Sequence, residues 1–124
     1  MGTRILLVFL GGGLGSVFRY VLGYLYNSND YLTPYGTFFA NVLGSFLIGI
    51  LAGYNLRTLH LNHQYQALLV VGFLGGFTTF SSFTFESMTM LNNGKFLLFF
   101  SYFFTTLILG MVGVMAGYFL SKYF

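Results

Sequence analysis

The stretch LLVVGFLGGFTTFSSFTFES, residues 68–87, begins as a membrane helix would and then changes character. Its apolar start meets the adjacent glycines Gly75 and Gly76, and residues 75–87 hold six hydroxyl side chains and four phenylalanines. Glycine lowers helix stability, and threonine hydroxyls compete for backbone hydrogen bonds. The stretch therefore predicts a helix that breaks near residues 75–79.

A break inside a membrane helix has a restricted set of explanations. Lipid cannot satisfy the freed backbone groups, so they must face protein or an aqueous cavity. Freed carbonyls can bind a cation, and the N–H groups that open the next half-helix attract an anion. The break therefore favours an ion site, with a flexible glycine pair used only for packing as the alternative.

The composition of the whole chain supports a membrane setting. Of its 124 residues, 56% are hydrophobic and only 6% are charged, against about 25% charged residues in an average soluble domain. Four stretches reach the ~20 residues that a span needs. We predict an all-α integral membrane protein whose residues 1–124 form a single four-helix domain, with spans at about 5–26, 36–54, 65–90 and 96–120.

Several function classes are disfavoured by what the chain lacks. It has no cysteine, and its five Lys and Arg residues are too few and too scattered for a nucleic-acid surface. His60 and His63 lie in a polar link, where a solvated pair is a simpler interpretation than a metal site. Glu86 is the one acid that comes close to lying inside a span, and it is toward the end of the third. No nucleophile has a base beside it in the sequence, so we do not expect an enzyme.

The charges that set membrane orientation are almost balanced. Four spans place both termini on one side, together with Arg4, Arg57 and Lys122, whereas the links on the other side carry only Lys95. This predicts a slight preference for cytoplasmic termini. The bias is weak enough to be compatible with insertion in both orientations.

Small residues recur at helical spacing, as they do where membrane helices pack closely. The predicted packing positions are Asn41, Ser45, Gly49 and Gly53 in the second span, Gly11 and Gly15 in the first, and Gly113 and Gly117 in the fourth. Asn41 is polar, and a carboxamide within a span needs a partner. It bonds a neighbouring helix, or it offers N–H donors to an ion that passes along the stripe.

Beyond the predicted break, Phe80 and Phe83 share a helical face beside Thr79 and Ser82. Aromatic rings are positive at their edges and negative on their faces, so a ring turned edge-on suits a small anion. Ordinary packing is the simpler interpretation. Arg19, late in the first span, attracts anions to a vestibule or extends to the membrane interface.

Three segments together closely resemble the signatures of the Fluc (CrcB-type) fluoride channel family: GGGLGSVFRY (11–20), GTFFANVLGSFLIG (36–49) and GFLGGFTTFSSF (72–83). The resemblance extends over all four spans in order. It implies a dual-topology homodimer of two antiparallel copies, with two fluoride pathways along their interface. It also implies passive export of cytoplasmic fluoride, fluoride resistance, and a location in the bacterial inner (plasma) membrane.

The resemblance also implies roles for particular residues. It places a structural sodium ion at the dimer interface, held by the backbone carbonyls of Gly75 and Thr78. The residues that it assigns to the fluoride pathway are Asn41, Phe80, Phe83, Thr79, Ser82, Tyr102, Thr106 and Arg19. Thr105 is an alternative to Thr106 in the fourth span.

Two other classes fit four small spans. A small multidrug exporter inserts in both orientations, but it needs a membrane-embedded carboxylate that exchanges protons, and the first span has none. A structural membrane subunit would use the glycine stripes only to pack partners.

Overall fold

The computed structural model describes residues 1–26, 30–58 and 61–124, and His60 lies outside the described residues. Helices account for the regular structure of these ranges, and none of their residues forms a strand. Four helical spans are long and apolar enough to cross a membrane: Gly2–Leu25, Tyr35–Thr58, His63–Asn92 and Phe96–Tyr123. The prediction of an all-α protein with four membrane-spanning helices is confirmed.

The spans differ in how continuous they are. The first is α1 (Gly2–Leu25) and the second is α2 (Tyr35–Thr58), each one unbroken helix. The fourth is α6 (Phe96–Leu120), extended by the short 3₁₀ helix η2 (Ser121–Tyr123). The third is assembled from four pieces, α3 (His63–Tyr65), η1 (Gln66–Leu74), α4 (Gly75–Phe77) and α5 (Phe80–Asn92).

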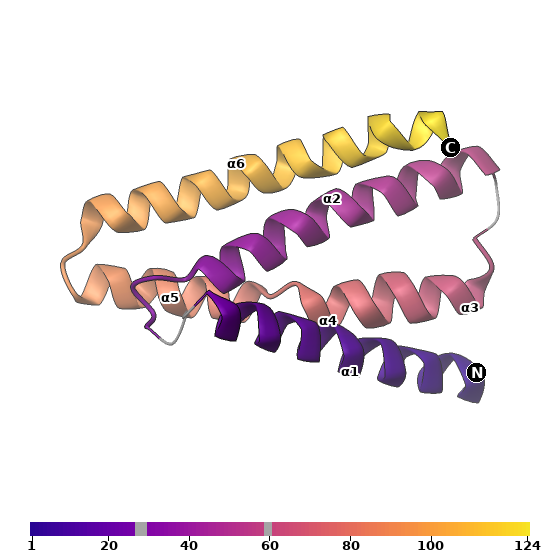
Figure 1. Ribbon diagram of the computed structural model, residues 1–124, viewed down its shortest axis with the longest axis horizontal. Helices are drawn as coiled ribbons and strands as arrows, with labels where there is room; N and C mark the ends of the chain where they lie inside the picture. Colours follow the sequence, from indigo (N-terminus) through magenta and orange to yellow (C-terminus); the bar gives the residue numbers. More distant parts are fainter. Residues whose placement is uncertain (27–29, 59–60) are drawn as a thin grey trace.

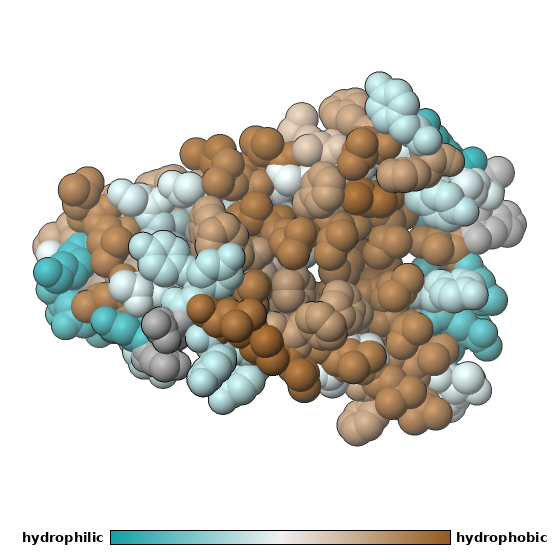
Figure 2. Space-filling view, in the orientation of Figure 1, coloured by the Kyte–Doolittle hydropathy of each residue, from teal (hydrophilic) through white to brown (hydrophobic). Residues whose placement is uncertain are grey.

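The helices pack as two neighbouring pairs. α1 lies along η1 and α4, and α2 lies along α6, with both termini at the same end of the molecule (Figure 1). Hydrophobic residues cover the middle of the face seen in Figure 2, and hydrophilic residues gather toward both ends of the long axis. This distribution fits helices that cross a lipid layer with their ends in water.

Glycines allow the backbones of α1 and the third span to touch. A side chain at Gly11 would collide with Leu68 O, one at Gly15 with Phe73 O, and one at Gly76 with Gly12 O. Because membrane helices associate through such close approach rather than through a hydrophobic driving force, this contact fixes the third span against α1.

Glycines also allow the backbones of α2 and α6 to touch. A side chain at Gly49 would collide with Val114 O, and one at Gly117 would collide with Phe46 O. The prediction that the glycine positions of α1, α2 and α6 form close-packing faces is confirmed at both contacts.

The first half of the third span differs from what the sequence predicts. Residues Gln66–Leu74 form a π-helix, η1, where an ordinary α-helix was expected. An apolar segment of nine residues does not by its composition distinguish the wider π turn from the α turn. π-helical segments are frequent beside functional sites, and this one ends directly before the break.

Candidate functional site

The third span is interrupted at two residues near its middle. Thr78 (φ −81°, ψ 156°) and Thr79 (φ −150°, ψ 122°) have extended backbone conformations, which separate α4 from α5. The hydroxyl of Thr78 donates to Leu74 O at 2.8 Å, and Thr78 N donates to the same oxygen at 2.9 Å. The predicted break is therefore present, and it lies at the threonines rather than at the glycines.

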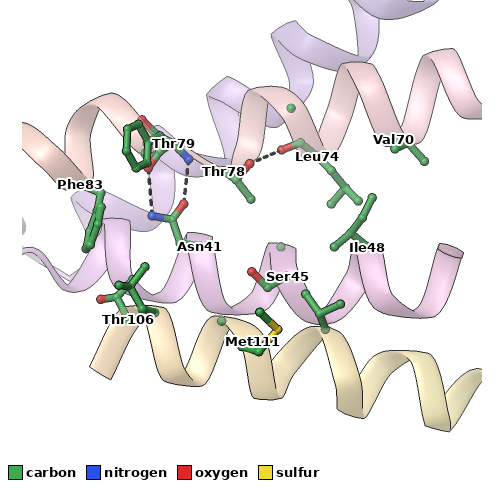
Figure 3. Close-up of a pocket in the computed structure, with 16 residues that line it drawn as sticks. Asn41, Ser45, Ile48, Val70, Leu74, Thr78, Thr79, Phe83, Thr106 and Met111 are labelled. Atoms are coloured by element: carbon green, nitrogen blue, oxygen red, sulfur yellow. Dashed lines mark hydrogen bonds between the residues drawn. The ribbon is translucent and has the colours of Figure 1, made fainter. Parts of the chain in front are cut away.

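Asn41 on α2 pairs with the backbone of the break. Thr79 N donates to Asn41 Oδ1 at 2.8 Å, and Asn41 Nδ2 donates to Thr79 O at 3.0 Å (Figure 3). Of the two interpretations of Asn41, bonding to a neighbouring helix is therefore observed. A carboxamide has two N–H donors, so one remains after the bond to Thr79 O.

Two carbonyls at the break lose the donors that a continuous helix would supply. In an α-helix, Thr79 N–H would donate to Gly75 O and Ser82 N–H would donate to Thr78 O. Here Thr79 N–H donates to Asn41, and Ser82 N–H donates to Thr79 Oγ1 at 3.2 Å. Gly75 O and Thr78 O are therefore released by the fold, and they belong to the two residues to which the family resemblance assigns sodium.

A third carbonyl of the break, Gly76 O, is already engaged. Arg19 Nε donates to it at 3.2 Å, and the Ser16 hydroxyl donates at 3.5 Å. The guanidinium thus stands where the helix formed by η1 and α4 ends, and a positive charge is favourable at a helix C-terminus. Arg19 contacts the break directly, rather than only reaching toward a membrane interface.

A groove of about 550 Å³ runs beside the break, between α2, α6 and the third span (Figure 3). It brings together most of the residues that the sequence analysis proposed for the site: Asn41, Gly75, Thr78, Thr79, Phe80, Phe83 and Thr106. Asn41, Thr78 and Thr79 provide polar groups at the break, while Ile48, Val70 and Met111 are among the apolar lining residues. The groove is more open than enclosed.

Arg19 and Ser82 lie outside this groove. Both line a second hollow of about 210 Å³, together with Thr37 and Glu86. This hollow is lined by α1, the start of α2 and α5. Tyr102 and the alternative residue Thr105 line a third hollow, of about 300 Å³. The predicted site residues are thus divided among three hollows.

The two phenylalanines of α5 are in different environments. Phe83 is 3% exposed and packs against Tyr102 and Phe103, whereas Phe80 is 77% exposed. Their ring centroids are 6.3 Å apart, with an angle of 45° between the ring planes. In one copy of the chain, Phe83 therefore belongs to the core, and Phe80 projects from it.

Glu86, for which the sequence predicts no role in the site, is buried in a hydrogen-bonded network. Thr37 Oγ1 donates to Glu86 Oε1, and the Tyr102 hydroxyl donates to Glu86 Oε2, both at 2.7 Å. Thr106 Oγ1 in turn donates to Tyr102 O at 2.7 Å. The sequence did carry a signal for this network. An acid within an apolar span needs hydrogen-bond partners, so polar side chains on neighbouring spans could have been expected near Glu86.

Side-chain metal chemistry has no support in the part of the chain that the structure describes. Within residues 1–26, 30–58 and 61–124, no three His, Cys, Asp or Glu side chains are close enough to hold a metal ion together. A cation at this site would need the released carbonyls of the break instead.

The four apolar spans define a small multi-pass membrane protein, whose third span is interrupted beside a groove. Over residues 6–118 the sequence matches the family described as CrcB-like protein, Camphor Resistance (CrcB). The chain belongs to this family.

Relatives of similar length share the sequence almost from end to end. A protein of Phocaeicola vulgatus named fluoride-specific ion channel FluC is 43% identical over 95% of this chain and 98% of its own length. Proteins with the same name from Leptospira interrogans and Gloeothece citriformis are 42% and 44% identical, over 97% and 96% of this chain and 95% and 97% of their own lengths.

Proposed function

We propose that this chain is a fluoride-selective ion channel, through which cytoplasmic fluoride leaves passively down its electrochemical gradient. The observation that carries the proposal is the groove at the break, which gathers seven of the ten expected site residues in a chain whose relatives are named fluoride-specific ion channels. The proposed result for the cell is fluoride resistance. No catalytic step is assigned to the chain.

The conduction mechanism relies on neutral donors. Fluoride holds its hydration shell tightly, so a pore must replace that shell with hydrogen-bond donors in a narrow passage. The remaining N–H of Asn41, the hydroxyls of Thr79 and Ser82, and the ring edges of Phe80 and Phe83 are the proposed contacts. The hydroxyls of Tyr102 and Thr106 each have one hydrogen, which donates to Glu86 Oε2 and to Tyr102 O in the single copy, so each must leave that bond before it can donate to fluoride. Arg19 supplies positive charge in the adjacent hollow. Selectivity over chloride is then a difference between two binding free energies. Each is set by how well the donors of the pore replace the water molecules that the ion loses.

We propose that two antiparallel copies form the channel. A groove that is open beside the break, with Phe80 exposed at its edge, requires a cover before it can exclude lipid. A second copy of the chain is the proposed cover, and the nearly balanced Lys and Arg residues permit insertion in both orientations.

The carbonyls of Gly75 and Thr78 fit a structural sodium ion, because each has lost its helical donor. Carbonyl oxygen is a suitable ligand for a hard cation. These two residues of each copy would hold the ion at the proposed dimer interface. When bound, the ion supplies positive charge that compensates the released carbonyls.

The location that we propose is the inner (plasma) membrane of a bacterium. The chain has four apolar spans, and the relatives named above are bacterial. A multidrug exporter has less support, because both oxygens of the buried Glu86 carboxylate accept hydrogen bonds and the exporter needs an acid that exchanges protons with water.

Flux from reconstituted liposomes tests the proposal. Liposomes loaded with potassium fluoride or potassium chloride and treated with valinomycin should release fluoride and retain chloride, whereas protein-free liposomes should retain both. Equal release of the two ions would rule out the proposed selectivity. No release of either ion would favour the structural-subunit alternative.

A further inference from the structure

The release of two carbonyls at the break depends on two specific side chains. The Asn41 carboxamide accepts the Thr79 N–H at 2.8 Å, and the Thr79 hydroxyl accepts the Ser82 N–H at 3.2 Å. Without these acceptors, the same two N–H groups could return to Gly75 O and Thr78 O and restore a continuous helix. Each carbonyl is thus free because another group holds its donor.

Glycine flexibility does not account for this geometry. Gly75 has helical backbone angles (φ −62°, ψ −36°), so the glycine does not use its conformational freedom here. The chain leaves the helix only at Thr78 and Thr79. Asn41 Nδ2 also donates to Thr79 O at 3.0 Å. The carboxamide therefore bonds both the N–H and the C=O of Thr79, as a residue of a neighbouring antiparallel strand would.

We propose that Asn41 and Thr79 are positioning residues for a cation site. Their side chains accept hydrogen bonds from the two N–H groups that would otherwise donate to Gly75 O and Thr78 O. This inference rests on the sodium site proposed above and extends it. Asn41 then has two functions, because its carboxamide fixes the break while one N–H donor remains for an anion in the groove that Asn41 lines. The same carboxamide links the cation site to the anion pathway.

Three variants and one control separate positioning from general stability. Asn41→Ala removes the acceptor of the Thr79 N–H, and Thr79→Val removes the acceptor of the Ser82 N–H at nearly constant volume. Thr79→Ser retains a hydroxyl acceptor and is the conservative rescue. Ser45→Ala is the matched control, because Ser45 lines the groove one turn from Asn41 but has no hydrogen bond to the break.

The first measurement is the carbon-13 chemical shift of Thr78 and Thr79 in the purified protein, which reports whether their backbone is extended or helical. We expect helical shifts at these residues in Asn41→Ala, a partial change in Thr79→Val, and extended shifts in Thr79→Ser and Ser45→Ala. Extended shifts in both Asn41→Ala and Thr79→Val would overturn the proposal, whatever happens to fluoride flux.

The second measurement is the rise in Tm when sodium replaces N-methylglucamine, followed as a function of sodium concentration. Asn41→Ala removes two hydrogen bonds to Thr79, and Thr79→Val removes one to Ser82. The half-effect concentration should therefore rise about tenfold in Thr79→Val and by at least as much in Asn41→Ala. Thr79→Ser and Ser45→Ala should match the unmodified protein. An unchanged half-effect concentration in Asn41→Ala and Thr79→Val would overturn the proposed link to the cation.

The two measurements also separate this inference from the proposed sodium site. If sodium does not raise the Tm of the unmodified protein, the sodium site is wrong, and so is the part of this inference that concerns a cation. The chemical shifts then still decide whether Asn41 and Thr79 hold the break open.

Discussion

The hydroxyl of Tyr102 on α6 donates a 2.7 Å hydrogen bond to Oε2 of Glu86 on α5, and both residues are 8% exposed. Thr37 on α2 donates to the other carboxylate oxygen. Three of the four spans therefore meet at one buried acid. Because a buried charge is costly unless it is hydrogen-bonded, this network explains how an apolar bundle accommodates Glu86.

Tyr102→Phe should lower the free energy of unfolding. The change keeps the ring that packs on Phe83 but leaves Glu86 Oε2 without its donor. An unsatisfied buried acceptor costs about 1–3 kcal/mol, and a charged one costs more. Unfolding of the purified protein, followed by circular dichroism, measures the loss. Tyr123→Phe is the control, since Tyr123 is 86% exposed, and an equal loss in both variants would contradict the role of the network.

The fold was largely predictable because membrane insertion depends on local composition. Apolar length defines the four spans, and the glycine spacing in α1, α2 and α6 indicates their contact faces. The threonines that follow Gly75 and Gly76 similarly indicated a break. These signals lie within single segments, so one sequence is enough to detect them.

The details of the site were less predictable because they join distant residues. Asn41 and Thr79 are 38 positions apart, and Thr37 and Glu86 are 49 positions apart. Their hydrogen bonds depend on how α2 packs against the third span, which no local pattern encodes. For the same reason, the family resemblance grouped Arg19, Ser82 and Tyr102 with the pathway, whereas the structure places them in hollows separate from the groove.

Gly15→Ala should prevent normal packing of α1, whereas Gly13→Ala in the same helix should not. The added methyl group at Gly15 would collide with Phe73 O of the third span, but at Gly13 it would have no atom within 4 Å. Alanine is also about 1 kcal/mol better than glycine within a helix. Size-exclusion profiles and Tm values of the two purified variants measure the difference, and similar profiles would show that this close contact is not required.

The adjacent glycines at the break should respond differently to the same change. A methyl group at Gly76 would collide with Gly12 O, whereas one at Gly75 would lie 3.9 Å from its nearest neighbour, Val70 O. We therefore expect Gly76→Ala to misfold and Gly75→Ala to fold with a Tm at least equal to that of the unmodified protein in sodium-free buffer. Fluoride flux through Gly75→Ala should still fall, because its methyl group occupies the groove beside the released carbonyl. Normal flux would argue against a role for this part of the groove.

Phe83 and Phe80 offer the clearest separation of stability from conduction, because they share one helix but differ in burial. Phe83→Ala should cost about 3–5 kcal/mol of unfolding free energy, as is usual for a phenylalanine removed from a packed core. Phe80→Leu should cost far less, since Phe80 is mostly exposed in a single copy and leucine retains much of its apolar volume. If the ring edge of Phe80 contacts fluoride, Phe80→Leu should nevertheless reduce fluoride efflux from liposomes strongly, because leucine lacks the positive edge of an aromatic ring.

Phe104→Leu is the control for this efflux measurement. Phe104 is a half-exposed phenylalanine of α6 that lines neither the groove nor the hollow beside Arg19. Equal efflux from Phe80→Leu and Phe104→Leu would assign Phe80 to packing between copies and remove it from the pathway.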